Sequence, residues 1–150
     1  MCGLFGVFKP THLSTDERKA LVEIGMLSFF RGTDSTGISV ITKKKPASEK
    51  VDHFIVKGVN HSIDFFKQEH VLNACFNQKA TSIMGHARAA THGTVNQANA
   101  QPMRENSIIG THNGVVRKFT PDKKEEDEYS DSRKLFQAID NLPIETVLKS

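Results

Sequence analysis

The second residue of the chain is a cysteine, Cys2, and a glycine follows it. A thiol becomes a strong nucleophile once a base removes its proton, and the free α-amine of an N-terminal cysteine, with a pKa of about 7.7 to 8.0, can act as that base. Because a small second residue permits removal of Met1, the mature chain can begin with such a cysteine. The alternative interpretation is a small buried hydrophobic residue, since cysteine is among the most buried residue types.

The segment "GHARAATHG", residues 85–93, combines a fixed positive charge with glycine-flanked backbone. Arg88 offers a fork of donors that can hold a carboxylate at two points, and Thr91 adds a hydroxyl three residues later. Gly85 and Gly93 would let backbone come close to a ligand. The same pattern also fits an arginine in a structural ion pair beside turn glycines.

The histidines and cysteines favour neither a metal site nor a disulfide framework. His86 and His92 lack a third ligand at a recognisable spacing, so we expect packing or hydrogen-bonding histidines. Cys2 and Cys75 are too few for a disulfide framework, which favours a free thiol in a reducing compartment. No window approaches the roughly 18 to 20 apolar residues of a membrane span, and the N-terminus does not look like a secretion signal. We therefore expect a cytoplasmic protein.

Two further short motifs carry polar groups with more than one use. In "THNG", Asn113 and Gly114 can form a tight turn, or they can present an amide side chain and a bare backbone N–H to one point. Such donors stabilise the negative oxygen that forms when a nucleophile attacks a carbonyl. In "SDS", Asp131 can cap a helix or hold the ammonium group of an amino-acid ligand.

Hydrophobic periodicity and turn signals predict the elements that must position these motifs. We expect strands at residues 2–8, 38–42, 51–57, 81–87 and 107–112, and helices at 14–30, at 62–76 and from Ser130 or Asp131 onward. Ser14 and Glu17 have the spacing of a capping box. The turn-rich "RGTDSTG", residues 31–37, is either a shaped loop under a site or a simple connection. Because hairpins outnumber strand-helix-strand units, the pattern predicts an α+β fold with antiparallel pairing.

Length and charge narrow the classes of protein. A chain of 150 residues with 37% hydrophobic residues suits one domain. The net charge of +3 is small, and the basic run 43–46 and the acidic run 125–128 are predicted to be solvated loops and not phosphate-binding sites. We therefore expect no nucleic-acid partner.

In order along the chain, Cys2-Gly3, "RGTDSTG", "GHARAATHG", "HNG" and Asp131 resemble the motifs of class II glutamine amidotransferase domains, within the N-terminal-nucleophile (Ntn) hydrolase superfamily. Five ordered motifs are far more specific than any one alone. The resemblance extends from residue 2 to about residue 132. The motif wording is nearer to the glucosamine-6-phosphate synthase branch than to the phosphoribosyl amidotransferase or asparagine synthetase branches.

The resemblance implies a catalytic role for three of these residues. Cys2 would attack the side-chain amide of L-glutamine, with its own α-amine as the proton shuttle. Asn113 and Gly114 would form the oxyanion hole. Ammonia would leave, and water would hydrolyse the γ-glutamyl thioester to glutamate.

The resemblance also implies how glutamine is bound. Arg88, with help from Thr91, would bind the α-carboxylate, and Asp131 would bind the α-ammonium group. Two departures from the family pattern bear on these assignments. Ala89 stands where that branch usually has a tryptophan, which affects loop packing and coupling to an acceptor site, and the stretch from Gly114 to Asp131 is shorter than usual.

The fold implied is an Ntn-hydrolase-type four-layer αββα sandwich with antiparallel sheets, incomplete at the C-terminus. We expect residues 1–150 to be a glutaminase domain that is part of a longer chain, or a reduced version completed by a partner or by self-association. We expect no cofactor and no metal. The resemblance implies an ammonia-acceptor synthase, separate or fused, that lies outside this sequence. Two other classes stay open, namely a different Ntn amide or peptide hydrolase and a non-catalytic glutamine-binding module.

Overall fold

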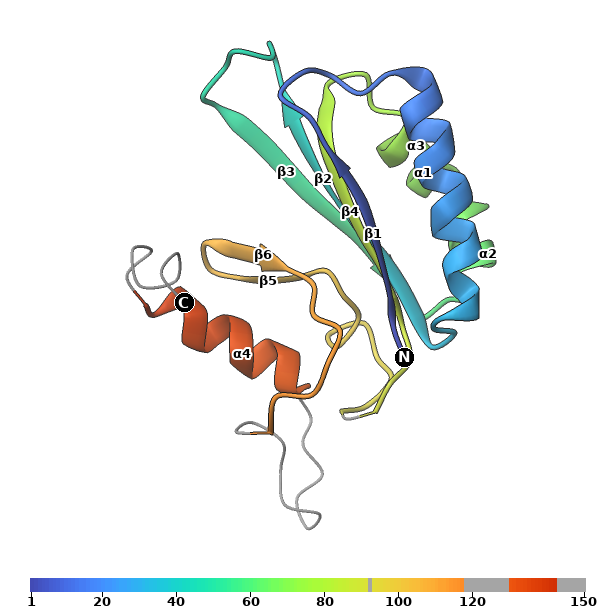
Figure 1. Cartoon of the computed structure of the whole chain (residues 1–150), viewed down its shortest axis with the longest axis vertical. Coiled ribbons are helices and arrows are strands. Elements are labelled where there is room, and N and C mark those ends of the chain that lie inside the picture. The colour runs from blue at the N-terminus through green and yellow to red at the C-terminus, as the bar shows by residue number, and fades with distance from the viewer. Residues whose placement is uncertain (92, 118–129, 143–150) are drawn as a thin grey trace.

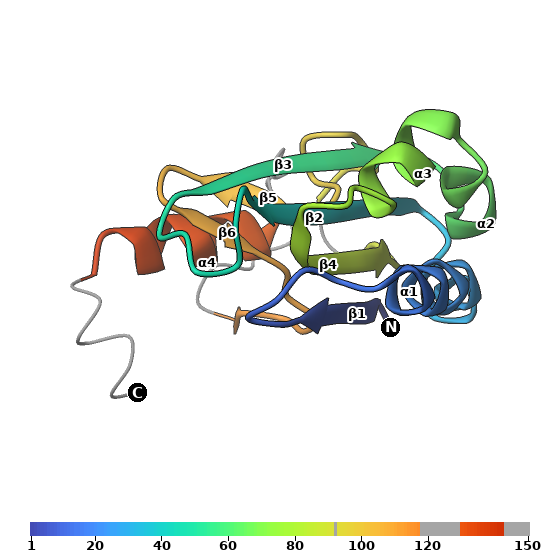
Figure 2. The same cartoon turned by 90° about the horizontal axis from the view of Figure 1, so that it is seen from above.

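The computed structural model describes residues 1–91, 93–117 and 130–142 of the chain. It shows an α+β arrangement in which helices cover one face of a four-stranded antiparallel sheet, while a two-stranded sheet and one further helix lie on the other side (Figures 1 and 2). The strands are β1 (Gly3–Phe8), β2 (Ser35–Lys43), β3 (Val51–Gly58), β4 (Ala80–Arg88), β5 (Met103–Glu105) and β6 (Ile108–Gly110). The helices are α1 (Thr15–Leu27), α2 (Ser62–Phe66), α3 (Glu69–Cys75) and α4 (Asp131–Asp140), with a 3-10 turn at Ser28–Phe30. The prediction of an α+β fold with antiparallel pairing is confirmed.

The larger sheet brings three distant segments to one end. Its strand order is β1-β4-β2-β3, and every neighbouring pair is antiparallel. At that end Gly3 pairs with Ala87, and Ser35 pairs with Arg88. The sheet register therefore places Cys2 beside the end of β4, where Arg88 is the last residue of the strand.

The helical layer buries the main core against this sheet. α1 begins with the predicted capping box, in which the Ser14 side chain accepts from the Glu17 N–H and the Glu17 carboxylate accepts from the Ser14 N–H. Ile38, Ile83 and Phe66 are almost fully buried beneath the helices. Burial of each such side chain contributes about 1.5 to 3 kcal/mol, so this layer provides a rigid base for the end of the sheet.

One glycine of "GHARAATHG" belongs to this core and not to a ligand site. A Cβ at Gly85 would overlap the aromatic ring of Phe5, which packs over that position from β1. The expectation that Gly85 admits a ligand is therefore wrong. Its small size serves the packing of an aromatic ring against the sheet.

The helix predicted over residues 62–76 is divided in two. α2 ends at Phe66, and Gln68 adopts an extended conformation with ψ 131° before α3 begins. Both short helices point apolar side chains, including Phe65 and Val71, into the core. The apolar spacing is thus compatible with one helix or with two, and the break is decided by how the segment packs.

The part of the fold that β5, β6 and α4 form differs most from the sequence-based expectation. The strand expected at 107–112 is the three-residue β6, which pairs with β5, a strand that was not predicted. Asn106 occupies the turn with φ 45°, and its side chain donates to Asp140 at the end of α4. A side chain at Gly110 would overlap Phe136, so α4 packs closely over this hairpin.

Three polar segments were predicted to be loops. Of the run 43–46 that was predicted to be a hairpin tip, Lys44, Lys45 and Pro46 lie between β2 and β3, whereas Lys43 is the last residue of β2. The acidic run 125–128 lies outside the described residues. β2 begins at Ser35, so the second half of "RGTDSTG" is strand and not loop. Among the residues described, no helix is both long and apolar enough to cross a membrane.

Candidate active site

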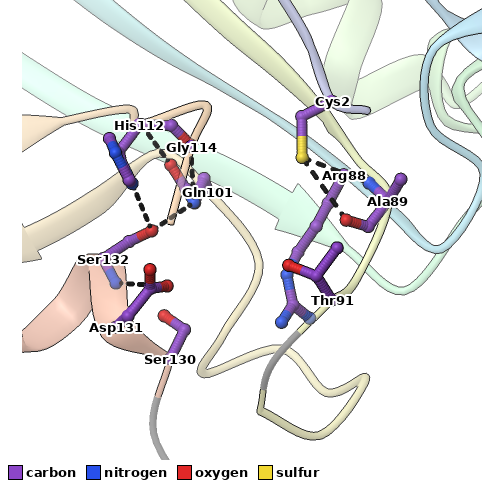
Figure 3. Close-up of a pocket in the computed structure, with 10 residues that line it drawn as sticks. All are labelled: Cys2, Arg88, Ala89, Thr91, Gln101, His112, Gly114, Ser130, Asp131 and Ser132. Carbon is purple, nitrogen blue, oxygen red and sulfur yellow. Dashed lines mark hydrogen bonds between the residues drawn. The ribbon is translucent and has the colours of Figure 1, made fainter. Parts of the chain in front are cut away.

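A small open pocket lies between the end of the larger sheet and the start of α4 (Figure 3). Its lining residues are Cys2, Arg88, Ala89, Thr91, Gln101, His112, Gly114, Ser130, Asp131 and Ser132. Five of the six residues that the sequence singled out are among them, and the sixth, Asn113, hydrogen-bonds the backbone of Cys2. The six predicted residues, which come from four separate segments of the sequence, therefore lie close together.

The Cys2 sulfur lies against the backbone of Ala89. The Ala89 N–H donates to Sγ at 3.3 Å, and the thiol lies 3.5 Å from the Ala89 carbonyl oxygen (Figure 3). Cys2 is only half-buried, and it lines the pocket. These contacts fix the position of the thiol at the end of the sheet where β1 begins and β4 ends.

The second cysteine offers no comparable chemistry. Cys75 is fully buried in the core under the helical layer. Burial raises the pKa of its thiol to about 12, so it is protonated and inert at neutral pH. Of the two thiols, that of Cys2 is the one that lines the pocket.

Arg88 projects from the end of β4 and is 3% exposed. Its Nη1 donates to the Thr94 carbonyl at 3.2 Å, and its Nη2 donates to the Gly93 carbonyl at 3.4 Å. Burial lowers the pKa of the guanidinium, while the nearby Cys2 and Asp34 oppose that shift. Arginine stays protonated in proteins, so the pocket holds a fixed positive charge whose orientation the loop carbonyls set.

The first half of "RGTDSTG" braces this charged end of β4. The Asp34 N–H donates to the Arg88 carbonyl at 2.9 Å, and the Asp34 carboxylate accepts from the Ala90 N–H at 2.6 Å. A Cβ at Gly32 would lie 2.5 Å from the Ala87 carbonyl oxygen, so only glycine allows the loop to approach so closely. Asp34 is the aspartate of the motif that suggested a shaped loop under a site, and its contacts agree with that interpretation.

Asp131 supplies the opposite charge across the pocket. It is the first residue of α4, whose N-cap is Ser130, and it is 6% exposed. Its Oδ2 accepts from the Val116 N–H at 2.7 Å and its Oδ1 accepts from the Ser132 N–H at 2.9 Å. An ionised carboxylate has about four acceptor positions, so these two bonds orient it and leave capacity for a ligand cation.

Asn113 and Gly114 lie close to Cys2 and do not form a type I′ hairpin turn. The Asn113 amide Nδ2 donates to the Cys2 carbonyl at 3.2 Å. Neither residue has a positive φ, which a type I′ turn would require at both positions. A Cβ at Gly114 would lie 2.9 Å from His112 Nε2, so glycine keeps the backbone close to that ring.

A buried amide, which the sequence did not single out, joins both sides of the pocket. Gln101 Oε1 accepts from the His112 N–H at 2.6 Å, and Gln101 Nε2 donates to the His112 carbonyl at 3.3 Å and to Ser132 Oγ at 3.2 Å. Ser132 Oγ also lies 3.0 Å from His112 Nδ1 (Figure 3). A single amide in an irregular polar segment has no period or motif that could reveal this role.

A second amide of the same segment, Asn99, links the segment after β4 to the start of α4. Its Nδ2 donates to the Thr94 carbonyl at 3.0 Å, and its Oδ1 accepts from the Ser130 N–H at 3.0 Å. Gly93 adopts φ 73°, and a Cβ there would lie 3.1 Å from the Ser130 nitrogen. Gly93 was expected to let backbone approach a ligand; the close approach that the structure shows at Gly93 is instead to the backbone of Ser130.

No ordinary metal site accompanies these residues. Within residues 1–91, 93–117 and 130–142, no group of three or more His, Cys, Asp or Glu side chains could hold a metal ion. His92, which was weighed as a ligand, lies outside the described residues. The chemistry of the pocket is that of a thiol, a guanidinium, a carboxylate and amide groups.

His86 lies behind the pocket and is fully buried. Neither ring nitrogen makes a hydrogen bond of ordinary geometry to the part of the chain that the structure describes. Burial lowers its pKa from 6.5 to about 4, and the backbone of His112 opposes this shift without offsetting it. The imidazole is therefore neutral at physiological pH.

We expect His86 to make the fold acid-sensitive. Between pH 6.5 and pH 4 the unfolded chain binds a proton at His86 that the folded chain does not. The free energy of unfolding therefore falls by up to about 3 kcal/mol as the pH is lowered through that range. Urea denaturation at pH 7 and pH 4.5 should show a smaller loss for His86→Phe than for the wild type. The exposed His70 provides the control, and His70→Gln should keep the wild-type loss. Equal losses in wild type and His86→Phe would contradict this assignment.

Comparison with known proteins identifies relatives of this chain. A scan against protein-family models gives no match. The chain is 30% identical over 125 residues to the glutamine–fructose-6-phosphate aminotransferase (isomerizing) of Gluconobacter oxydans, and the match covers 83% of this chain and 18% of that protein. The proteins of that name from Pyrococcus horikoshii and Streptomyces coelicolor are each 32% identical, over 127 and 123 residues.

The latter two matches cover 83% and 81% of this chain, and 19% and 18% of those relatives. The chain thus spans about a fifth of the length of the curated relatives it matches. Its motifs occur in the order that the resemblance requires, and the residues they contain surround one pocket. The chain therefore belongs to the class II glutamine amidotransferase family.

Proposed function

We propose that this chain hydrolyses L-glutamine to glutamate and ammonia, with Cys2 as the nucleophile. The observation that carries the proposal is the meeting of Cys2, Arg88, Thr91, Gly114 and Asp131 on one pocket from separate segments of the chain. A nucleophile, a fixed cation and a carboxylate are the groups that a free α-amino acid with a side-chain amide needs. The name of the relatives, which contains glutamine, agrees with that ligand chemistry.

In the proposed complex, the α-carboxylate of glutamine binds the Arg88 guanidinium and the Thr91 hydroxyl. The α-ammonium group binds Asp131, which two backbone N–H groups hold in place. Opposite charges at the two substrate groups fix the orientation of the amino acid, so its side-chain amide extends toward the Cys2 sulfur. Correct positioning of reacting groups lowers a large part of the barrier in such reactions.

The proposed chemistry has two steps. The α-amine of Cys2 accepts the thiol proton as Sγ attacks the amide carbon, and the proton passes to the leaving nitrogen, which departs as ammonia. Asn113 and Gly114 donate to the oxyanion that forms in this step. Water then attacks the γ-glutamyl thioester, which breaks the carbon-sulfur bond and returns the proton to the thiol as glutamate leaves.

The proposal requires removal of Met1, because the amide bond to Met1 withholds the α-amine. Met1 is 82% exposed, so a processing enzyme can reach it. The small side chain at position 2 favours the same cleavage. In the processed chain the new amine lies on the same residue as the thiol.

We also propose that residues 1–150 act as a glutaminase domain whose ammonia is used by a synthase, separate or fused. The relatives are named for transfer of an amino group to fructose 6-phosphate, and about four fifths of their length lies outside the match. Acceptor chemistry of that kind would therefore belong to residues other than these 150. The four-layer αββα Ntn arrangement is part of the same proposal, with the helical layer, the larger sheet, the β5-β6 hairpin and α4 as its four layers.

Glutamate release from L-glutamine by the purified protein tests the function, with intact mass measured on the same sample. We expect release that depends on loss of the Met1 mass, and no release from D-glutamine, whose α groups cannot meet Arg88 and Asp131 together with its amide at Cys2. A fully processed sample without release would refute the proposal. Equal hydrolysis of simple amides that lack α groups would instead favour a different Ntn amide hydrolase.

A further inference from the structure

The segment that contains Gln101 is anchored to the larger sheet. The Lys57 ammonium, from β3, donates to the Ala100 carbonyl at 2.8 Å. The Gln101 backbone packs so closely over Gly37 of β2 that a Cβ on that glycine would overlap the Gln101 carbonyl oxygen. Gln101 is therefore fixed to the same sheet that carries the nucleophile and Arg88.

From this anchor, the side chain of Gln101 holds the segment that follows β6. Its amide bonds both the N–H and the carbonyl of His112, at 2.6 and 3.3 Å. Ser132 Oγ lies 3.2 Å from Gln101 Nε2 and 3.0 Å from His112 Nδ1, which closes a three-residue cluster. Gln101 and Ser132 are each 3% exposed, so water competes little for these bonds.

We propose that Gln101 and Ser132 are positioning residues that fix residues 112–114 relative to Cys2, and that they act on the rate of attack more than on glutamine affinity. This inference rests on the proposed glutaminase function. Asn113 and Gly114 would contact the oxyanion, which exists only as the thiol attacks, whereas Arg88 and Asp131 would contact groups present in free glutamine. A shift of the 112–114 segment therefore changes kcat and leaves KM nearly unaltered.

Substitution of Ser132 can affect kcat without disturbing the neighbouring Asp131. Asp131 Oδ1 is held by the Ser132 backbone N–H, which alanine retains. Ser132→Ala thus removes the hydroxyl contacts to Gln101 and His112 while the proposed ammonium ligand keeps its backbone donor. Ser132→Thr keeps a hydroxyl and serves as the conservative variant.

The test compares glutamine hydrolysis with alkylation of Cys2 by iodoacetamide, in processed protein. Alkylation displaces iodide from carbon and forms no oxyanion, so it reports on the thiol alone. We expect Ser132→Ala to lower kcat by about 10- to 100-fold, with KM within about threefold and the alkylation rate within about twofold of wild type. Ser132→Thr should recover most of kcat.

Ser62→Ala is the matched control, because Ser62 is also fully buried and donates its hydroxyl to the Met26 carbonyl, in the helical layer. It should lower stability without lowering kcat. Gln101→Met, which removes the amide at nearly constant volume, should repeat the Ser132→Ala result and covers the case in which Ser132→Ala folds poorly.

The inference is overturned if Ser132→Ala and Gln101→Met keep wild-type kcat, if alkylation slows in proportion to hydrolysis, or if threonine fails to restore the rate. A processed wild type that releases no glutamate is a different result, since it refutes the proposed function itself. Active wild type with unaffected variants refutes the positioning role alone.

Discussion

Cys2→Ala is expected to lower kcat for glutamine hydrolysis by about 10⁴-fold or more, because no other described group at the pocket can form the thioester. Glutamine binding should change little, since the proposed contacts to its α groups come from Arg88, Thr91 and Asp131. Glutamate release measures the first effect, and isothermal calorimetry with L-glutamine measures the second.

The buried cysteine is the matched control for this substitution. Cys75→Ala removes the other thiol, whose pKa burial raises to about 12, from the hydrophobic core. It should lower the free energy of unfolding and leave kcat unchanged. Substantial turnover by processed Cys2→Ala, or an equal loss of turnover in Cys75→Ala, would remove Cys2 from the nucleophilic role.

The second large effect concerns Arg88 and the α-carboxylate. Arg88→Ala should raise KM for L-glutamine by about 30- to 1,000-fold, the range expected when one partner of a buried charge pair is lost. Arg88→Lys should recover only part of this, because lysine lacks the planar fork of donors. Arg88→Ala also removes the hydrogen bonds that hold the Gly93 and Thr94 carbonyls, so loosening of that loop adds to the loss.

A substrate without the α-carboxylate separates these contributions. L-Glutamine α-amide keeps the side-chain amide and the α-ammonium group, and release of its γ-hydrolysis product can be followed. If Arg88 binds the carboxylate, wild type should prefer glutamine strongly over the α-amide, and Arg88→Ala should lose most of that preference, since the two deletions remove one interaction. An unchanged preference in the variant would show that Arg88 shapes the loop without contacting the carboxylate.

Local signals were sufficient where one segment carries its own structural information. The Ser14 and Glu17 side chains close their capping box within four residues, and β1 is an apolar run of six residues. The site motifs were recognisable for a similar reason, since each places its functional residue beside glycines or at an element end. Their convergence on one pocket needed the sheet register and the docking of α4.

The features that were missed depend on contacts between distant segments. β5 has three residues, too few for alternation to stand out, and it exists because β6 pairs with it. Gln101 and Asn99 act through side-chain amides whose partners lie up to 31 residues away. Gly85 was misassigned because a glycine that admits a ligand and a glycine that admits a phenylalanine ring look alike in sequence.

The pocket is built from two parts of the fold, the larger sheet and α4, and this affects how the protein loses function. The thiol and the guanidinium belong to the large sheet with its hydrophobic core, whereas the carboxylate belongs to α4, which packs on a hairpin with three-residue strands. Small elements with few buried contacts open at lower free energy than a core sheet. Heat or denaturant should therefore separate the two halves of the pocket before the chain unfolds as a whole, so that inactivation is an early, reversible undocking event rather than a report of global denaturation.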